Sequence, residues 1–214
     1  MSYSIPTIPS PTSNGRQIAI ADIHGCCNTF EALLQKLKLS KNDQIFLLGD
    51  LIDKGNCSKG VVDLVMDLKQ QGYGIFVLKG NHEQAFLKTY DCGWDFFTAY
   101  LDKNNTEAFL GNNLNTYLQF FAELEYAYDL GDWILSHAEF LAGERSLYRG
   151  MRGLFSGVNF ELKDEALLKK RQVTGHFVKS MTKIKQSIEG KNRVIFLDNG
   201  CIYQDAWVLC VLLT

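Results

Sequence analysis

Five short clusters along this chain carry side chains that bind metal ions in proteins. In chain order they are Asp22-Ile23-His24-Gly25, Gly49-Asp50-Leu51-Ile52-Asp53, Gly80-Asn81-His82-Glu83, Ser136-His137-Ala138 and Gly175-His176. The chain contains four histidines, and every one falls in one of these clusters. A single histidine is more often an ordinary core or surface residue than a ligand. The presence of all four histidines in such clusters indicates that the clusters form one shared site.

The mixture of carboxylate, amide and imidazole groups limits the metal. It favours Mn, Fe or Zn over Ca or Mg, which prefer ligand sets made of oxygen alone. Six residues are candidate ligands: Asp22, His24, Asp50, Asn81, His137 and His176. They suit two ions better than one, because a shared Asp50 would give each ion protein ligands and leave positions open for water and a phosphate oxygen. The pattern predicts a two-metal centre.

Each cluster follows a segment that reads as a β-strand. Apolar or β-branched runs at 17–21, 44–48, 73–78, 171–174 and 193–197 alternate with helical patterns, which is typical of an α/β protein. Helices are expected from residue 28 and over 58–71 and much of 83–125, a hairpin over 126–136, and a last strand over 202–213. In such proteins the ligand site lies beyond the carboxyl ends of the strands. Loops far apart in sequence can therefore meet there.

The composition is that of one globular domain. The 214 residues are 46% hydrophobic, and 22 basic against 24 acidic residues leave a formal net charge of −2. This balance gives no indication of nucleic acid or a membrane as a partner. All three prolines lie in the first eleven residues, so we expect a flexible leader over 1–16 and the domain over 17–214.

The six cysteines form no C-x-x-C pair, and no export signal precedes the domain. Reduced thiols and a cytoplasmic location are therefore expected. Adjacent Cys26 and Cys27 could make the protein redox-sensitive, although ordinary buried residues are the simpler interpretation. The longest apolar run, 207–213, is far shorter than the roughly 20 residues needed to cross a bilayer.

The order of the first three clusters resembles the phosphoprotein phosphatase (Ser/Thr phosphatase) branch of the calcineurin-like metallophosphoesterases, including its small bacterial and phage members. His137-Ala138, Gly175-His176 and the segment 196–201 extend the resemblance over nearly all of the chain after Arg16. It implies a metallophosphoesterase β-sandwich, in which two mixed sheets are flanked by helices. It also implies two divalent ions, with Mn expected and Fe or Zn as alternatives.

The resemblance further implies roles for individual residues. Asp22, His24 and Asp50 would bind the first metal, and Asp50, Asn81, His137 and His176 the second, so that Asp50 bridges them. A hydroxide bridging the two metals would attack phosphorus directly, His82 would protonate the leaving alkoxide, and Asp53 would orient His82. An alkoxide leaving group needs this proton, whereas a metal-held hydroxide needs no side-chain base.

Two positions depart from the family pattern. Lys54 and Lys79 stand where the family usually has arginine. Each is expected to bind phosphate as a point charge without the two-pronged grip of a guanidinium group, the alternative being a solvated surface lysine. Arg149 and Arg152 are candidates to complete the phosphate site. The aromatic residues of 86–121 could line a substrate groove, but core packing is the more common role for such residues.

Three functions remain open. The first is a phosphatase acting on phosphoserine or phosphothreonine of proteins, or phosphotyrosine, or on a small phosphoester. The second is a symmetrical dinucleoside tetraphosphate hydrolase, a group that resembles this chain in the Asp-x-His-Gly-Cys opening but tends to lack the aspartate at position 53 and to read Gly-Asn-His-Asp. Asp53 and Glu83 favour the first function. The third is a non-catalytic metal-binding module, and the oligomeric state is not predicted.

Overall fold

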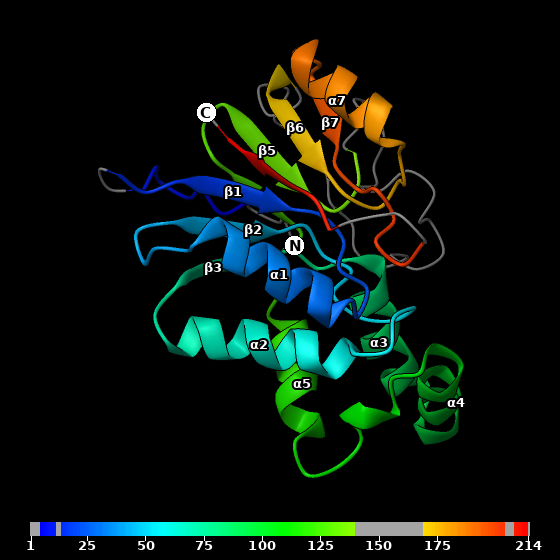
Figure 1. Ribbon diagram of the computed structural model, residues 1–214. Coiled ribbons are helices and arrows are strands. Elements are labelled where there is room, and N and C mark those ends of the chain that lie inside the picture. The colour runs from blue at the N-terminus through cyan, green and yellow to red at the C-terminus, as the bar shows by residue number, and fades with distance from the viewer. Residues whose placement is uncertain (1–4, 12–13, 140–168, 204–207, 214) are drawn as a thin grey trace.

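Two four-stranded mixed sheets face each other, and helices cover their outer faces (Figure 1). The computed structural model describes residues 5–11, 14–139, 169–203 and 208–213. Helices α1 (Cys27–Leu37) and α2 (Ser58–Gln70) lie along the first sheet, and α7 (Met181–Glu189) lies against the second. The predicted fold class, a β-sandwich of two mixed sheets flanked by helices, is confirmed.

The first sheet has the strand order β3-β2-β1-β8. Its strands are β1 (Gln17–Ile20), β2 (Gln44–Leu47), β3 (Gly74–Val77) and β8 (Cys210–Leu212). The first three run parallel, with α1 and α2 as crossover connections, and β8 pairs antiparallel with β1. The predicted last strand is shorter than expected, because Cys201 and Ile202 lie in a turn and β8 begins at Cys210.

The second sheet has the order β4-β5-β6-β7. Its strands are β4 (Ala127–Asp129), β5 (Trp133–Ser136), β6 (Arg171–Thr174) and β7 (Val194–Phe196). Strands β4 and β5 form the predicted hairpin, and Gly131 takes a left-handed φ of 85° in its turn. Strands β5, β6 and β7 are parallel. Each sheet therefore contributes three parallel strands with a common carboxyl end.

Side chains alternate between two cores along the strands. In β2, Ile45 and Leu47 belong to a core shared with the helices, whereas Phe46 and the following Leu48 pack with Tyr128 between the sheets. This is the period of two that a pleated strand imposes. The buried apolar layer between the sheets fixes how their strand ends face each other.

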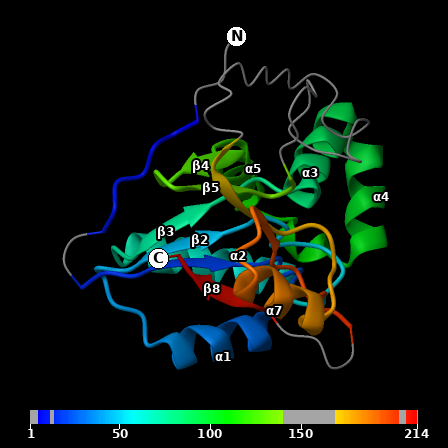
Figure 2. The same ribbon diagram turned by 90° about the horizontal axis from the view of Figure 1, so that it is seen from above.

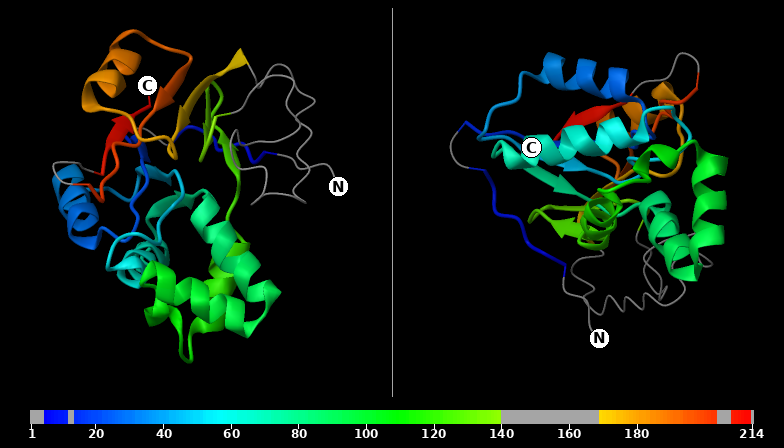
Figure 3. Two further views of the ribbon diagram at one scale, coloured as in Figure 1. Left: turned by 90° about the vertical axis from the view of Figure 1, so that its right-hand side faces the viewer. Right: turned by 90° about the horizontal axis from the view of Figure 1, so that it is seen from below.

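A helical layer lies on the side of the molecule away from α1 (Figures 2 and 3). It consists of α3 (Asn81–Cys92), α4 (Trp94–Asn104), the short 3-10 helix η1 (Glu107–Phe109) and α5 (Leu114–Ala122). Phe86 lies at its centre, with ring centroids 4.9 Å from Phe97, 5.3 Å from Phe109 and 5.1 Å from Phe121. These rings form core, whereas Trp94 and Phe96 are 56% and 67% exposed.

Part of the segment expected to be a leader contacts the second sheet. The Ile8 amide donates to the Asp129 carbonyl oxygen at 2.9 Å, and the Asp129 amide donates to the Pro6 carbonyl oxygen at 2.9 Å. Residues 6–8 therefore extend the edge of the sheet beside β4. Among the described residues, no helix has the length and apolar character required to span a bilayer.

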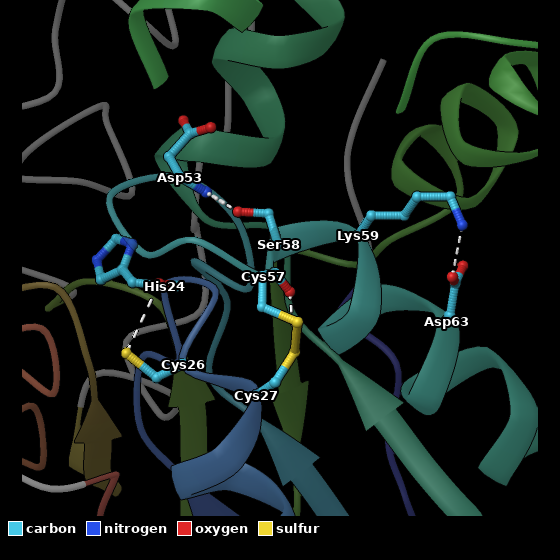
Figure 4. The surroundings of a disulfide bond; sticks show 8 residues. All are labelled: His24, Cys26, Cys27, Asp53, Cys57, Ser58, Lys59 and Asp63. Carbon is cyan, nitrogen blue, oxygen red and sulfur yellow. Dashed lines mark hydrogen bonds and ion pairs between the residues drawn. A yellow bond between two sulfur atoms is a disulfide. The ribbon is translucent and has the colours of Figure 1, made fainter. Parts of the chain in front are cut away.

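The structure contradicts the expectation of fully reduced thiols. Cys27 and Cys57 form a disulfide that joins the start of α1 to the residue preceding α2 (Figure 4). Thirty residues separate them, so the pairing depends on how the two helices pack and has no local sequence signal. Cys26, Cys92, Cys201 and Cys210 are free thiols.

Candidate metal centre

The clusters predicted from the sequence meet where the parallel strands of both sheets end. In the first sheet, Asp22 and His24 follow β1, Asp50 follows β2 and Asn81 follows β3. In the second sheet, His137 follows β5 and His176 follows β6. The six predicted metal ligands are thus delivered by five strands to one place.

Asp50 stands at the centre of this arrangement. Its Oδ2 lies 3.5 Å from His24 Nε2 and 3.4 Å from His137 Nε2. One group able to hold a metal ion comprises His24, Asp50 and His82, and a second comprises Asp50, His137 and His176, with ligand atoms within 4.8 Å of one another in each group. Asp50 belongs to both, which is the position expected of a bridging ligand.

Asn81 and Asp22 complete the cluster. Asn81 Oδ1 lies 3.0 Å from His137 Nε2 and 3.1 Å from His176 Nδ1. Asp22 Oδ2 lies 3.9 Å from His24 Nε2 and accepts the His176 backbone N–H at 3.0 Å. All six residues predicted as ligands therefore share one set of contacts.

Backbone carbonyl groups orient two of the imidazole rings. His24 Nδ1 lies 3.0 Å from the Ile52 carbonyl oxygen, and His137 Nδ1 lies 2.8 Å from the Leu48 carbonyl oxygen. In a neutral imidazole, a ring nitrogen that donates to a carbonyl oxygen leaves the other nitrogen without a proton, so that it can bind a metal. In both residues that other nitrogen, Nε2, points toward Asp50.

The buried carboxylates of the cluster alter the pKa values of the groups around them. Asp22 and Asp50 are 1% and 2% exposed, and burial raises the pKa of Asp22 well above its usual range, with Asp198 and Asp50 adding to the rise. Burial lowers the pKa of His137 less than its neighbours Asp50 and Asp22 raise it, and the result is about 10. Carboxylates buried in this way need a cation.

Two imidazoles are already in the form that binds metals. Burial lowers the pKa of His24 and of His176 to about 4, so both rings are neutral near pH 7. Neutral imidazoles beside buried carboxylates form a donor set that suits divalent transition-metal ions. The residues present therefore fit the two ions that the sequence predicts.

The loops that carry these side chains have a left-handed backbone. Nine non-glycine residues among those described have positive φ, and five of them lie in the predicted site: His24, Asp50, Asp53, Lys54 and His176, with φ between 45° and 68°. This conformation costs such residues on the order of 1 kcal/mol each. Its concentration at one place indicates that the fold holds these loops for function.

Glu83 holds two of the loops together. It is fully buried, and its Oε2 accepts the backbone N–H groups of Asp50 at 3.0 Å and Gly80 at 2.8 Å, while its Oε1 accepts that of Leu51 at 2.8 Å. Burial raises the pKa of Glu83 to about 7. In the sequence analysis, Glu83 ended the third cluster and favoured the first function, with no structural role assigned to it. Its place three residues after Gly80, at the start of a helix, is the signal that indicates this capping role.

Two glycines allow the clusters to approach closely. A Cβ atom on Gly80 would lie 2.2 Å from Asp50 Oδ1, and one on Gly175 would lie 1.9 Å from Asp22 Oδ1. Real Cβ atoms do not approach other atoms this closely. Any larger residue at either position would displace a predicted metal ligand.

The two residues predicted as catalytic form a pair beside the cluster. His82 Nδ1 lies 2.6 Å from Asp53 Oδ2, and His82 Nε2 lies 3.9 Å from Asp50 Oδ2. Asp53 is fully buried, whereas the His82 side chain is 18% exposed. Burial lowers the pKa of His82, but Asp50 and Asp53 outweigh it and raise the pKa above its usual value. The ring can therefore carry a proton at the edge of the metal centre.

The predicted phosphate-binding residues differ in their positions. Lys54 Nζ lies 2.8 Å from His24 Nε2, at the edge of the cluster. Lys79 Nζ instead donates to the Ala122 carbonyl oxygen at 2.9 Å and lies 5.0 Å from the centroid of the Tyr126 ring. Lys79 is buried and its ammonium group is engaged at the helical layer, so we leave it out of the proposed phosphate site. Arg149 and Arg152 lie outside the described residues.

Comparisons with known proteins agree with this geometry. A family model described as calcineurin-like phosphoesterase matches residues 15–197. A symmetrical bis(5'-nucleosyl)-tetraphosphatase of Wigglesworthia glossinidia brevipalpis is 42% identical over 72 residues, or 33% of this chain and 25% of the relative. The chain thus matches about a quarter of the length of that relative.

Two solved structures share the fold over nearly all of this chain. A putative diadenosine tetraphosphatase matches with a TM-score of 0.60 and 20% identity, over 98% of both chains. A cold-active protein tyrosine phosphatase matches with a TM-score of 0.61 and 18% identity, over 98% of this chain and 76% of the other. Likeness at this level of identity is evidence of the fold alone.

Proposed function

The chain belongs to the calcineurin-like phosphoesterase family, and on that premise we propose that it is a two-metal phosphomonoesterase acting on phosphoserine and phosphothreonine of proteins, with phosphotyrosine as a further substrate. The observation that carries this proposal is the His82–Asp53 pair beside a cluster that shares Asp50 between two metal-binding groups. The paired residues can supply a proton to the leaving group. A phosphomonoester needs this proton more than a phosphate anhydride does.

Asp22, His24, Asp50, Asn81, His137 and His176 would hold the two ions, with Mn as the expected metal and Fe or Zn as alternatives. When bound, two such ions generate a hydroxide nucleophile near neutral pH and neutralise charge on a phosphoryl group. Lys54, whose Nζ contacts His24 Nε2, adds a positive charge at the edge of the metal centre. A phosphate dianion is the substrate group that this arrangement favours.

His82 would donate a proton to the leaving oxygen. Its Nδ1 is held by Asp53, so its Nε2 is the atom that faces the centre. The leaving group of a serine or threonine phosphate is an alkoxide, a strong base that leaves slowly unless it is protonated. Asp53 keeps the ring oriented and stabilises its positive charge before transfer.

A symmetrical dinucleoside tetraphosphate is the second candidate substrate, and the curated relative favours it. In that substrate the leaving group is a phosphate chain, a much weaker base than an alkoxide, so it needs less help from an acid. The buried Asp53 and the hydrogen-bonded His82 are therefore the features of this chain that favour the monoester.

A direct comparison of substrates tests the proposal. Metal-free protein is supplied with Mn and assayed on phosphoserine, phosphothreonine and phosphotyrosine peptides and on diadenosine tetraphosphate, with His82→Asn alongside. We expect kcat/KM to be higher for the peptides and to fall by about 10² to 10⁴ in the variant. A preference for the tetraphosphate, with little effect of His82→Asn, would instead support the second candidate. Absence of turnover with every divalent metal would indicate a non-catalytic metal-binding module.

A further inference from the structure

Asp53 receives hydrogen bonds from two side chains of different elements. Its Oδ2 accepts His82 Nδ1 at 2.6 Å, and the same oxygen accepts the Tyr100 hydroxyl group. The Tyr100 hydroxyl group also lies 3.2 Å from the His82 carbonyl oxygen. Tyr100 therefore hydrogen-bonds to both members of the pair.

The helical layer places this hydroxyl group. Tyr100 lies on α4, 47 residues from Asp53 in sequence, and its ring packs edge-on against Phe86 with centroids 6.2 Å apart. Phe86 is the centre of the aromatic core described above. The rigid packing of that core fixes where the Tyr100 oxygen points.

Asp53 is otherwise lightly held. Its backbone has a left-handed φ of 68°, and its N–H donates to Ser58 Oγ at 2.9 Å (Figure 4). Among the residues that the structure describes, Asp53 Oδ1 has no hydrogen-bond partner. The carboxylate plane is therefore set by the two donors at Oδ2, of which one is the catalytic imidazole itself. Without Tyr100, the His82 imidazole would be the sole donor to the Asp53 carboxylate, although this carboxylate has to orient the imidazole.

We propose that Tyr100 is a positioning residue for the proton-donating pair, an inference that rests on the proposed function. Its hydrogen bond fixes the orientation of the Asp53 carboxylate, which in turn holds His82 Nδ1. His82 Nε2 is thereby kept facing the centre, where its proton passes to the leaving oxygen. Burial and the nearby Asp53 raise the pKa of Tyr100, so the hydroxyl group remains a donor.

The dependence of rate on the leaving group tests this role. A poorly oriented acid slows poor leaving groups more than good ones, so we expect Tyr100→Phe to lower kcat about tenfold for phenyl phosphate. The loss should be several-fold smaller for p-nitrophenyl phosphate, with KM and bound Mn unchanged for both. Equal losses for the two substrates would overturn the proposal, since a general structural defect would slow both alike.

The layer offers a matched control in Tyr117, whose hydroxyl group donates to Asp63 Oδ1 at 2.7 Å. Tyr117→Phe removes a tyrosine–aspartate hydrogen bond from the same layer, and we expect the same leaving-group dependence as in the unchanged protein. A double variant of Tyr100→Phe with Asp53→Asn should be no slower than Asp53→Asn alone. Additive losses would overturn the proposal. Inactivity of the unchanged protein on all phosphoesters would overturn the proposed function as well. This outcome differs from equal losses in an active enzyme, which would overturn the role of Tyr100 alone.

Discussion

The two ends of the first sheet both bury carboxylates, but the groups that surround these carboxylates differ. At the amino end of β2, Asp43 is 2% exposed and lies 2.6 Å from the Arg16 guanidinium group, which lowers the pKa of Asp43 to about 2. At the carboxyl end, Asp22 is equally buried, and burial raises its pKa. A buried carboxylate paired with a guanidinium group stabilises the fold, whereas buried Asp22, which lies among imidazole groups and further carboxylates, indicates a place for a metal ion.

The largest effect should come from the carboxyl end. Asp50→Asn removes the charge shared by both metal-binding groups, so we expect activity to fall by about 10³ or more and bound metal to drop sharply. Elemental analysis of the purified protein measures the metal. Asp63→Asn, on the partly exposed surface of α2, serves as the control and should keep both the activity and the bound metal of the unchanged protein. Retention of two ions by Asp50→Asn would contradict the assignment of the carboxyl end of the sheet as the metal site.

The disulfide makes a second contribution at the carboxyl end. The Cys27–Cys57 bond closes a loop of about 30 residues that contains Asp50 and Asp53. Loop-closure entropy predicts that Cys27→Ser with Cys57→Ser lowers the free energy of unfolding by about 3 to 4 kcal/mol relative to the oxidised protein. Denaturant titrations of oxidised protein, reduced protein and the double variant measure it, and identical midpoints for all three would contradict the expectation.

The smallest effect should come from the amino end and depend on pH. Arg16→Ala should cost about 1 to 2 kcal/mol of stability at pH 7, since the Arg16 side chain is 38% exposed and solvent weakens the pair. The pKa of Asp43 is lower in the folded protein than in the unfolded chain. Its contribution is therefore complete above about pH 4 and is lost as the pH falls toward 2.

Thermal unfolding of the unchanged protein and Arg16→Ala between pH 2 and 7 measures this dependence. The two curves should converge at the acid end, and kcat at pH 7 should be the same for both proteins. A fall in kcat on the scale of Asp50→Asn would show that the amino end is not separate from the site.

Much of the site was predictable because its residues are rare and follow strands. The six ligand candidates were identified from residue type and spacing and the His82–Asp53 pair from the family resemblance, and the structure brings all eight together. The strands β1, β2 and β3 were predicted to within one residue at each end, since their apolar runs stop at Asp22, Gly49 and Lys79.

What the sequence did not reveal depends on packing between distant elements. The charge of Lys79 fits a phosphate site, but the side chain is directed to Ala122 and Tyr126 by the position of the helical layer. The Cys27–Cys57 bond requires the starts of α1 and α2 to lie side by side. Tyr100 was one aromatic residue among many, and only the packing of α4 against α3 shows where its hydroxyl group lies.

Electron paramagnetic resonance of the protein during Mn titration tests the central claim most directly. If Asp50 bridges two ions, two Mn should bind per chain, and the spectrum should show magnetic coupling between neighbouring Mn ions as the second site fills. Asp50→Asn should abolish that coupling. A single bound Mn, or two with the uncoupled spectrum of isolated ions, would contradict the account.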